Sequence, residues 1–264
     1  MRLTRIFVNQ PLSSGILVEL PADTAAHLSK VLRARAKDQL VLFNGDGREF
    51  AGVIENVRGS RVSASVGAAV QLSRESPLAV TLVQCVPRGD RMDFIVQKAT
   101  ELGVARIVPV LSQRSVVRLD DKQSQSKAAH WRAVAVSACE QCGRNRLPEI
   151  AEPRPLINYL GESLACGPRL LFEPDITSTA PMDAPGAAVE IAIGPEGGFA
   201  ADELEAFRVS GFRRVHLGPR ILRTETAALA ALSWLQARFG DMQGLRELPS
   251  FPQQSSLRAA ANPE

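Results

Sequence analysis

Two segments in the C-terminal half of the sequence combine glycine, proline and charged residues in a spacing that suits ligand binding. The first is Gly194-Pro195-Glu196-Gly197-Gly198-Phe199, and the second runs from Leu217 to Ala227 (LGPRILRTETA). In both, proline directly follows glycine, so the loop is stiff while the glycine lets a ligand approach the backbone closely. Neither segment matches the glycine patterns of nucleotide-phosphate loops. The pair predicts two ligand-binding loops.

Each loop lies between a strand pattern and a helix pattern, which indicates how the fold positions it. Strands are predicted at Val189–Ile193 and Arg213–Leu217, and the helices that follow at Ala201–Ser210 and Glu225–Phe239. Loops at the carboxyl ends of parallel strands meet at one edge of an open α/β sheet, where such folds bind ligands. We therefore expect the two loops to lie side by side.

The preceding part of the chain continues the alternation of strands and helices. Further strands are predicted at Leu78–Val86, Ala105–Leu111 and Arg169–Glu173, and further helices at residues 92–102, Lys127–Cys142 and Leu156–Leu164. Alternation at this spacing predicts an α/β fold with an open, mostly parallel sheet and helices on both faces. Periodicity alone favours a doubly wound arrangement.

The first 73 residues have a different pattern, typical of a small β-barrel with one helix. Short strands separated by turn residues are predicted at Gly15–Leu20, Gln39–Phe43, Glu49–Val57 and Arg61–Ala69, and a helix begins near Asp23. We place the domains at residues 1–73 and 74–240. Residues 241–264 are polar and rich in structure-breaking residues, and we expect them to be disordered.

Composition and charge indicate a globular protein. Apolar residues make up 45% and charged residues 22% of the chain, and no apolar run is long enough for a membrane span. No secretory signal follows the N-terminus, so we expect a cytoplasmic protein without a membrane partner. The net charge is +3, but residues 1–74 hold ten Lys and Arg against six Asp and Glu. This modest basic excess fits a module that contacts RNA.

The cysteines and histidines do not predict a metal site. Cys139 and Cys142 form one C-x-x-C pair near the end of a predicted helix, whereas a zinc site needs a second close pair or nearby histidines. The remaining cysteines and the histidines are scattered along the chain, at Cys85, Cys166, His27, His130 and His216. We therefore expect reduced thiols and no bound metal.

The two loops closely resemble the signature loops of a known family, the SPOUT-class RNA methyltransferases that modify N3 of a uridine in 16S ribosomal RNA. The resemblance covers about residues 3 to 240. It includes Lys98–Val104 (KATELGV), Gln113-Arg114-Ser115, Glu140–Arg144 (EQCGR), Arg5-Ile6-Phe7 and His27–Arg33. The departures are small: Lys37-Asp38 occupies the place of an expected Gly-Asp turn, and Cys142 replaces another small residue.

The resemblance implies a fold and an assembly that the spacing does not reveal. It implies a trefoil knot in the parallel-sheet domain, a PUA-like RNA-binding barrel before it, and a homodimer formed through the knot domain. The methyl donor, S-adenosylmethionine, would lie between the two loops and the end of the strand containing Leu171 and Phe172. The implied donor-binding residues are Leu171, Phe172, Gly194, Pro195, Glu196, Gly197, Leu217, Gly218, Ile221, Leu222, Thr224 and Ala227.

Catalysis of this reaction needs charge stabilisation, because the uracil carbonyl oxygens gain negative charge when N3 loses its proton. Arg223 is the first candidate, since it ends the second loop and a cation at a helix start needs an anionic partner. Arg114 and Arg144 are further candidates, with Arg144 reaching the partner subunit's donor site. Glu196 is also a candidate, either to orient its loop or to act on the substrate. In the barrel, the candidates for phosphate contacts are Arg5, His27, Lys30 and Arg33.

The sequence leaves several alternatives open. The sequence is compatible with abstraction of the N3 proton by Glu196, with abstraction by Glu225, and with loss of the proton to solvent. Glu225 can instead cap its helix. Ile221 and Leu222 can be core residues, and His27 can be a buried histidine of the barrel. A non-catalytic RNA-binding protein, or an enzyme that methylates another RNA position, would fit much of the pattern. Whether free 16S rRNA or the 30S subunit is the substrate also stays open.

Overall fold

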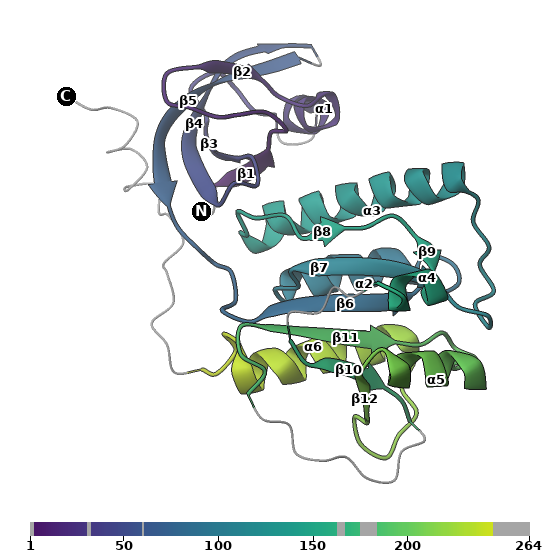
Figure 1. The fold of residues 1–264 in the computed structure, drawn as a ribbon. Helices are drawn as coiled ribbons and strands as arrows, with labels where there is room; N and C mark the ends of the chain where they lie inside the picture. The colour runs from purple at the N-terminus through teal and green to yellow at the C-terminus, as the bar shows by residue number, and fades with distance from the viewer. Residues whose placement is uncertain (1–2, 31–32, 60, 163–166, 175–183, 245–264) are drawn as a thin grey trace. The chain divides into compact units, whose positions relative to one another are not determined.

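The computed structural model describes residues 3–244, with gaps at 31–32, 60, 163–166 and 175–183 (Figure 1). These residues divide into two compact units, and each is treated by itself. Unit 1 contains residues 3–75 together with Cys139–Leu147, and unit 2 contains residues 76–138 and 148–244. The sequence did not predict that Cys139–Leu147 would group with the N-terminal strands. Most of the predicted tail, residues 245–264, lies outside the described residues.

Unit 1 contains one five-stranded sheet with the strand order β1-β3-β4-β5-β2. Its elements are β1 (Thr4–Phe7), β2 (Leu17–Glu19), α1 (Ala22–Lys30), β3 (Gln39–Phe43), β4 (Arg48–Arg58) and β5 (Arg61–Gln71). β1 pairs with β3 in parallel, while the other neighbouring strands are antiparallel. The predicted strands are confirmed, and β1 is additional because four residues are too few for a periodic pattern.

The core of unit 1 is formed by alternate residues of β5 together with residues of β4 and α1. Ile54 of β4 and the residues Val62, Ala64 and Val66 of β5 are buried and pack with Leu28 of α1. Two register shifts interrupt the β4–β5 pairing, between Phe50 and Gly52 and between Ile54 and Asn56. Such irregularities bend a long hairpin. Closure of the sheet into a barrel stays a prediction.

Unit 2 contains a seven-stranded sheet in which all pairings are parallel. Its strands are β6 (Ala79–Cys85), β7 (Arg106–Leu111), β8 (Glu149–Ile150), β9 (Arg154–Pro155), β10 (Arg169–Phe172), β11 (Ala188–Ile193) and β12 (Phe212–Val215). Six follow the order β12-β10-β11-β6-β7-β8, and β9 also pairs with β7. The prediction of a parallel α/β sheet is therefore confirmed.

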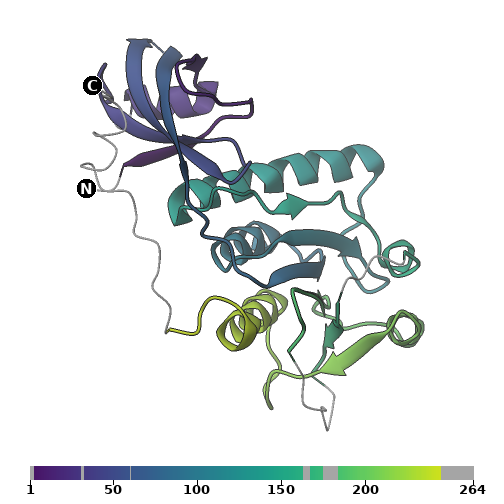
Figure 2. The ribbon, with the colours of Figure 1, turned by 60° about the vertical axis from the view of Figure 1, so that its left-hand side comes forward.

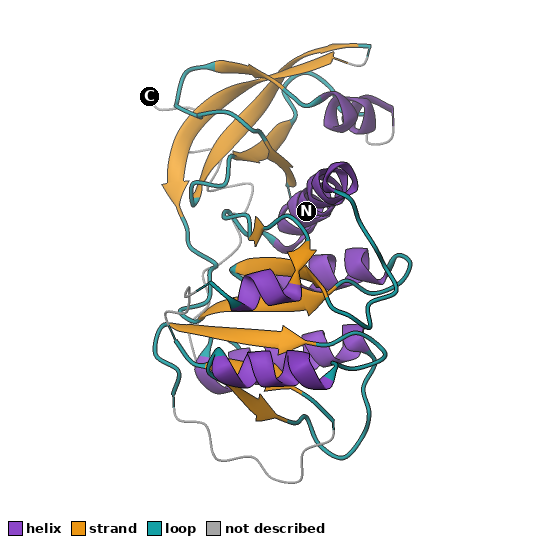
Figure 3. Ribbon diagram, turned by 45° about the vertical axis from the view of Figure 1, so that its right-hand side comes forward, coloured by secondary structure: helices purple, strands orange, loops and turns teal. Residues whose placement is uncertain are grey.

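Helices cover both faces of this sheet (Figure 3). The helices of unit 2 are α2 (Arg91–Glu101), α3 (Asp121–Cys142, of which the last four residues belong to unit 1), α4 (Leu156–Leu160), α5 (Ala201–Val209) and α6 (Thr224–Phe239). One apolar core joins the sheet to α2, α6 and Trp131 of α3, and the other joins it to α4 and α5. Figure 2 shows α6, in yellow-green, near the C-terminal end of the coloured ribbon.

The boundaries differ from the prediction where a polar contact decides them. Helix α3 begins six residues earlier than the predicted Lys127, since the Asp120 carboxylate accepts a hydrogen bond from the Gln123 N–H at 2.7 Å. Side chains of this type compensate free N–H groups at a helix start. After α2, Gly103 adopts φ of +79°, as expected for a helix-ending glycine. No helix in the described part of the chain has the length and apolar character needed to cross a membrane.

Candidate active site

A cavity of about 290 Å³ lies at the carboxyl ends of β10, β11 and β12. β10 is the middle strand of the three: Phe172 is in register with Ile193 on one side and with Val215 on the other. The three loops that follow these strands therefore meet at one edge of the sheet. The predicted residues that line the cavity are Phe172, Gly194, Pro195, Glu196, Leu217, Gly218, Ile221, Leu222, Arg223, Thr224 and Ala227.

Two of the predicted residues do not line this cavity. Leu171 is fully buried and packs in the core shared with α4 and α5. Successive side chains of a strand point to opposite faces, so Leu171 lies opposite its neighbour Phe172 and is no longer a candidate for a side-chain contact with a ligand. Gly197 lies in the loop but contacts Arg114 instead. Six more residues line the cavity that were not among the implied donor-binding residues, although three of them lie in the two predicted loops: Glu173, Pro174, Ile193, Gly198, Phe199 and Arg220.

Glycine is required at defined points of the two loops. Gly218 has φ of +92°, and a Cβ added there would meet no atom within 4 Å, so the backbone conformation is what selects glycine. At Gly194 the reason is contact, since a Cβ would lie 2.9 Å from the ring of Phe199. The backbone is thus open beside Gly218, whereas the Phe199 ring covers the corresponding side of Gly194.

The loop after β11 is held by side chains from other elements. The Arg114 Nη1 donates to the Gly197 carbonyl at 3.0 Å, which places this predicted catalytic arginine beside the loop within the same chain. The carboxylate of Glu203, at the start of α5, accepts from the Gln113 N–H at 2.8 Å and from the Ala200 N–H at 2.9 Å. One buried carboxylate therefore ties the segment after β7 to the loop after β11.

Arg223 and Thr224 occupy the start of α6 and differ in what they contact. Arg223 is the N-cap residue and is exposed, and its side chain makes no hydrogen bond or ion pair with the described residues. Its guanidinium is therefore available to a ligand of the cavity that it lines. Thr224 is buried, and its hydroxyl donates to the Gly194 carbonyl at 2.8 Å. Thr224 thus links the two predicted loops.

A third arginine, Arg91, lies close to both glutamates considered as proton acceptors. Its Nη1 is 2.5 Å from the Glu196 carboxylate, and its Nε is 3.9 Å from the Glu225 carboxylate. Glu225 lies in the first turn of α6 but has an ion-pair partner, so its contacts extend beyond helix capping. Glu196 lines the cavity, whereas Glu225 is absent from its lining within the described residues.

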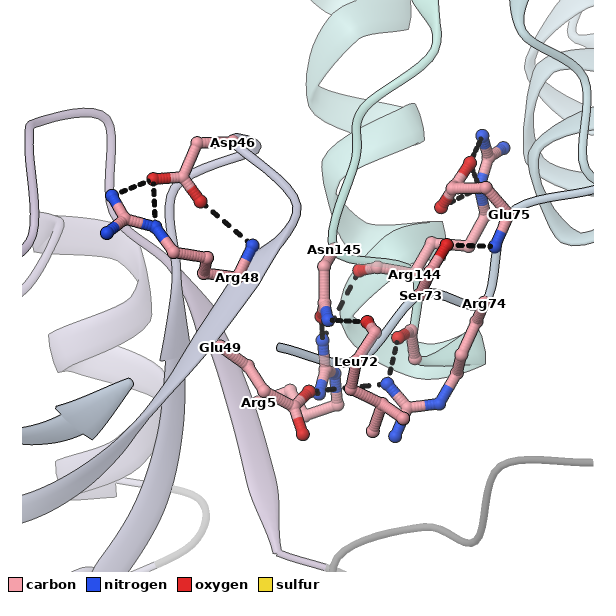
Figure 4. Close-up of polar contacts among 11 residues, drawn as sticks. Arg5, Asp46, Arg48, Glu49, Leu72, Ser73, Arg74, Glu75, Arg144 and Asn145 are labelled. Carbon is pink, nitrogen blue, oxygen red and sulfur yellow. Dashed lines mark hydrogen bonds and ion pairs between the residues drawn. The ribbon is translucent and has the colours of Figure 1, made fainter. Parts of the chain in front are cut away.

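The barrel candidate Arg5 is buried in unit 1 (Figure 4). Its Nη1 donates to the Glu49 carboxylate, and its Nη2 donates to the side-chain oxygen of Asn145. Only 3% of the Arg5 side chain is exposed, so its guanidinium is not available to a phosphate in this structure. We therefore withdraw Arg5 as a phosphate contact and assign it to the interior of unit 1.

Arg144 is also buried in unit 1, and both oxygens of the Glu75 carboxylate accept hydrogen bonds from its guanidinium (Figure 4). Glu140 accepts a hydrogen bond from the Phe7 N–H at 3.0 Å. The arginine is thus held by a carboxylate of its own unit, and it is not among the residues lining the cavity. This pairing opposes the prediction that Arg144 reaches a donor site across a dimer, and we do not carry that role further.

The other barrel candidates are only partly described. His27 and Lys30 lie in α1, and their side chains are outside the described residues. Arg33 is exposed, with φ of +51°. Among the described residues, no group of three or more His, Cys, Asp and Glu side chains is arranged to hold a metal ion.

Comparison with known proteins identifies the family. Residues 74–236 match the model of an RNA methyltransferase domain, and residues 20–66 match an RNA methyltransferase PUA domain. The ribosomal RNA small subunit methyltransferase E of Buchnera aphidicola is 33% identical over 242 residues, covering 91% of this chain and 98% of the relative. The chain belongs to this methyltransferase E family. The Bacillus subtilis member is 32% identical over 237 residues, covering 85% of this chain and 91% of the relative.

Two solved methyltransferase structures that are similar to this chain have the same fold. A ribosomal RNA small subunit methyltransferase E from Neisseria gonorrhoeae, bound to S-adenosyl methionine, is 36% identical with a TM-score of 0.86. The match covers 91% of this chain and 100% of the Neisseria chain. The methyltransferase Lpg2936 from Legionella pneumophila, in complex with the cofactor SAM, is 40% identical with a TM-score of 0.85. The match covers 91% of this chain and 100% of the Legionella chain.

Within this methyltransferase E chain, Arg91 is the functional candidate that sequence reasoning missed. A signal was present: Gly89-Asp90-Arg91 follows the end of β6 after just three intervening residues, and β6 is the strand that pairs with β11. The carboxyl end of β6 therefore lies next to the loop that contains Glu196. Periodicity predicted β6 but not its neighbour in the sheet, and the neighbour decides which loop Arg91 faces.

Proposed function

We propose that this protein transfers a methyl group from S-adenosylmethionine to N3 of a uridine in 16S ribosomal RNA. The observation that carries the proposal is the cavity at the ends of β10, β11 and β12, which is lined by both loops that resemble the family's signature loops. The RNA methyltransferase and PUA domain matches support an RNA substrate. The names of the relatives support the small-subunit rRNA.

The cavity suits the donor in size and in lining. Its volume of about 290 Å³ is near the lower end of the range for small-molecule sites. Leu217, Leu222 and Ala227 supply apolar lining, and the backbone at Gly218 has open space on the side where a Cβ would lie. Ile221 is 83% exposed at the cavity, so covering an aromatic ring would remove apolar surface from water. When bound, the donor supplies an already activated methyl group.

The catalytic work assigned to the protein is positioning and charge stabilisation. Arg223, whose side chain is exposed at the cavity and has no partner among the described residues, is our candidate to hold a uracil carbonyl oxygen as negative charge develops on it. Arg114 supplies a second positive charge while holding the Gly197 carbonyl. Glu196 lines the cavity and is our candidate to receive the N3 proton, with Arg91 holding its carboxylate in place.

The proposal includes an assembly and an RNA-binding unit. We propose that unit 2 contains a trefoil knot through which two copies pair, and that the enzyme acts in the cytoplasm on 16S rRNA within the 30S subunit. Unit 1 would hold the RNA, with Arg33, His27 and Lys30 as candidate phosphate contacts. The match of residues 20–66 to an RNA methyltransferase PUA domain supports this division of labour.

Methyl transfer from labelled S-adenosylmethionine to 30S subunits that lack their own modification tests the function. Wild type and Arg223→Ala are compared, and the RNA is digested to nucleosides. Label in 3-methyluridine with wild type, strongly reduced in the variant, is the expected result. Label in another nucleoside would overturn the N3 assignment while keeping the donor. Absence of transfer together with normal donor binding would favour a non-catalytic RNA-binding protein.

A further inference from the structure

A buried glutamine outside the two loops connects them to the centre of the sheet. Gln84, near the end of β6, is 0% exposed. Its Nε2 donates to the carbonyl of Cys85 and to the hydroxyl of Thr224, both at 2.9 Å. Thr224 in turn donates to the Gly194 carbonyl at 2.8 Å. This hydrogen-bonded chain joins β6 to the first residue of α6, directly after the second loop, and to the first glycine of the other loop.

The orientation of the Gln84 amide follows from its partners. A hydroxyl has one hydrogen, and that of Thr224 is used in the bond to Gly194, so Thr224 must accept from Gln84. The Cys85 carbonyl can only accept as well. Both partners therefore require the NH₂ group of Gln84, and an amide flip would break both contacts.

The same orientation leaves the Gln84 side-chain oxygen without a hydrogen-bond partner in the described structure. A buried polar atom without a partner costs stability, so an apolar side chain of similar shape would suit the core at least as well. Gln84 is therefore poorly explained as a residue kept for folding. What it contributes is a defined distance between β6 and the two loops.

We infer that Gln84 is a positioning residue for methyl-donor binding, acting through Thr224 to set the spacing of the two loops around the cavity. The inference rests on the proposed function of that cavity. It also changes the role expected for Thr224: its hydroxyl is used between the loops, so Thr224 contributes to donor binding by holding Gly194. Neither Gln84 nor Cys85 is among the described residues that line the cavity.

Calorimetric titration of the full chain with S-adenosylmethionine, together with thermal unfolding, tests the inference. Gln84→Met keeps the side-chain length and removes both donated hydrogen bonds. We expect it to weaken donor binding about tenfold, the scale of one or two lost hydrogen bonds, with an unchanged or higher Tm. Thr224→Val should weaken binding similarly, whereas Thr224→Ser keeps the hydroxyl and should bind within about twofold of wild type.

Gln236→Met is the matched control. Gln236 is also 0% exposed, but it contacts Ser76 and the Leu102 carbonyl at the far end of α6. Its replacement should lower Tm and leave donor affinity unchanged. Wild-type donor affinity in both Gln84→Met and Thr224→Val would overturn the inference but not the proposed function. Weakening of donor binding in Gln236→Met to the same extent as in Gln84→Met would do the same. A wild-type protein that binds no S-adenosylmethionine would overturn the proposed function and the inference with it.

Discussion

Nη1 of Arg91 lies 2.5 Å from Oε1 of Glu196, joining the first residue of α2 to the loop after β11. The start of a helix disfavours a cation, so Arg91 depends on nearby carboxylates for compensation. It has two, because Glu225 at the start of α6 is 3.9 Å away. Arg91 thereby connects three segments at the edge of the candidate active site.

Arg91→Ala should reduce methyl transfer with little effect on folding. The pair is partly exposed, at 40% for Arg91 and 37% for Glu196, so its loss should cost less than about 1 kcal/mol of stability. Without Arg91 the Glu196 carboxylate is no longer held in one position. Because catalysis depends on the position of the proton acceptor relative to the substrate, kcat/KM should fall about tenfold or more. Arg208→Ala, which breaks the exposed pair with Glu205 on α5, is the control and should leave transfer unchanged. Normal transfer by Arg91→Ala would refute this role.

Arg223→Ala should separate catalysis from donor binding. Removing a cation that stabilises developing charge costs about 10²–10³ in kcat for comparable groups, whereas the apolar contacts of the cavity are retained. Single-turnover methyl transfer and a donor titration measure the two effects. Arg213→Ala, an exposed arginine of β12, should change neither. A variant that loses donor affinity in proportion to activity would assign Arg223 to the donor instead.

Gly218→Ala should damage the second loop through backbone strain alone. At φ of +92° an L-residue is unfavourable by about 1–2 kcal/mol, and the added Cβ meets no neighbour. We expect a Tm lower by a few degrees and weaker donor binding. Gly161→Ala provides the comparison, because Gly161 has φ of −73° and its Cβ would be in ordinary contact at 3.6 Å. Equal effects of the two substitutions would contradict this explanation.

Glu49→Ala should destabilise unit 1 strongly. The Arg5–Glu49 pair is buried, with side chains 3% and 1% exposed, and removal of one partner of such a pair typically costs about 3–5 kcal/mol. Hydrogen exchange of the β1 and β3 amides should accelerate accordingly. Asp46→Ala removes the exposed partner of Arg48 in the same unit and should cost about 1 kcal/mol or less. Slow exchange in Glu49→Ala would show that Arg5 finds another partner.

The cysteine thiols provide a test that depends on pH. Burial raises the pKa of Cys85, and a hydrogen bond between the Cys139 and Cys142 thiols together with burial raises the pKa of Cys139. A raised pKa lowers the thiolate fraction at a given pH, so both should resist alkylation in the native protein at pH 8 and react after unfolding. Mass spectrometry of peptides after iodoacetamide treatment measures this. Rapid native labelling of Cys139 would contradict this expectation and show that the thiol is reactive in the folded protein.

In unit 1, residue type alone led to wrong roles for two arginines, Arg5 and Arg144. Arg5 lies in a short segment near the N-terminus, and an arginine there suggests an exposed phosphate contact. In the structure its guanidinium is enclosed by Glu49 and Asn145, residues far along the chain. Arg144 is enclosed in the same way by Glu75. Residue type indicates that an arginine needs an anion, but only the fold decides whether a carboxylate or a phosphate provides it.

The sequence by itself determined the local elements and the two loops. Alternating and helical periodicities depend on neighbours in the chain, and glycine followed by proline marks a stiff loop wherever it occurs. Most residues expected around the donor therefore line the cavity. The strand order β12-β10-β11-β6-β7-β8 was decided by tertiary structure. That order places Arg91 beside Glu196 and Gln84 beside Thr224, because contacts between distant segments depend on which strands pair.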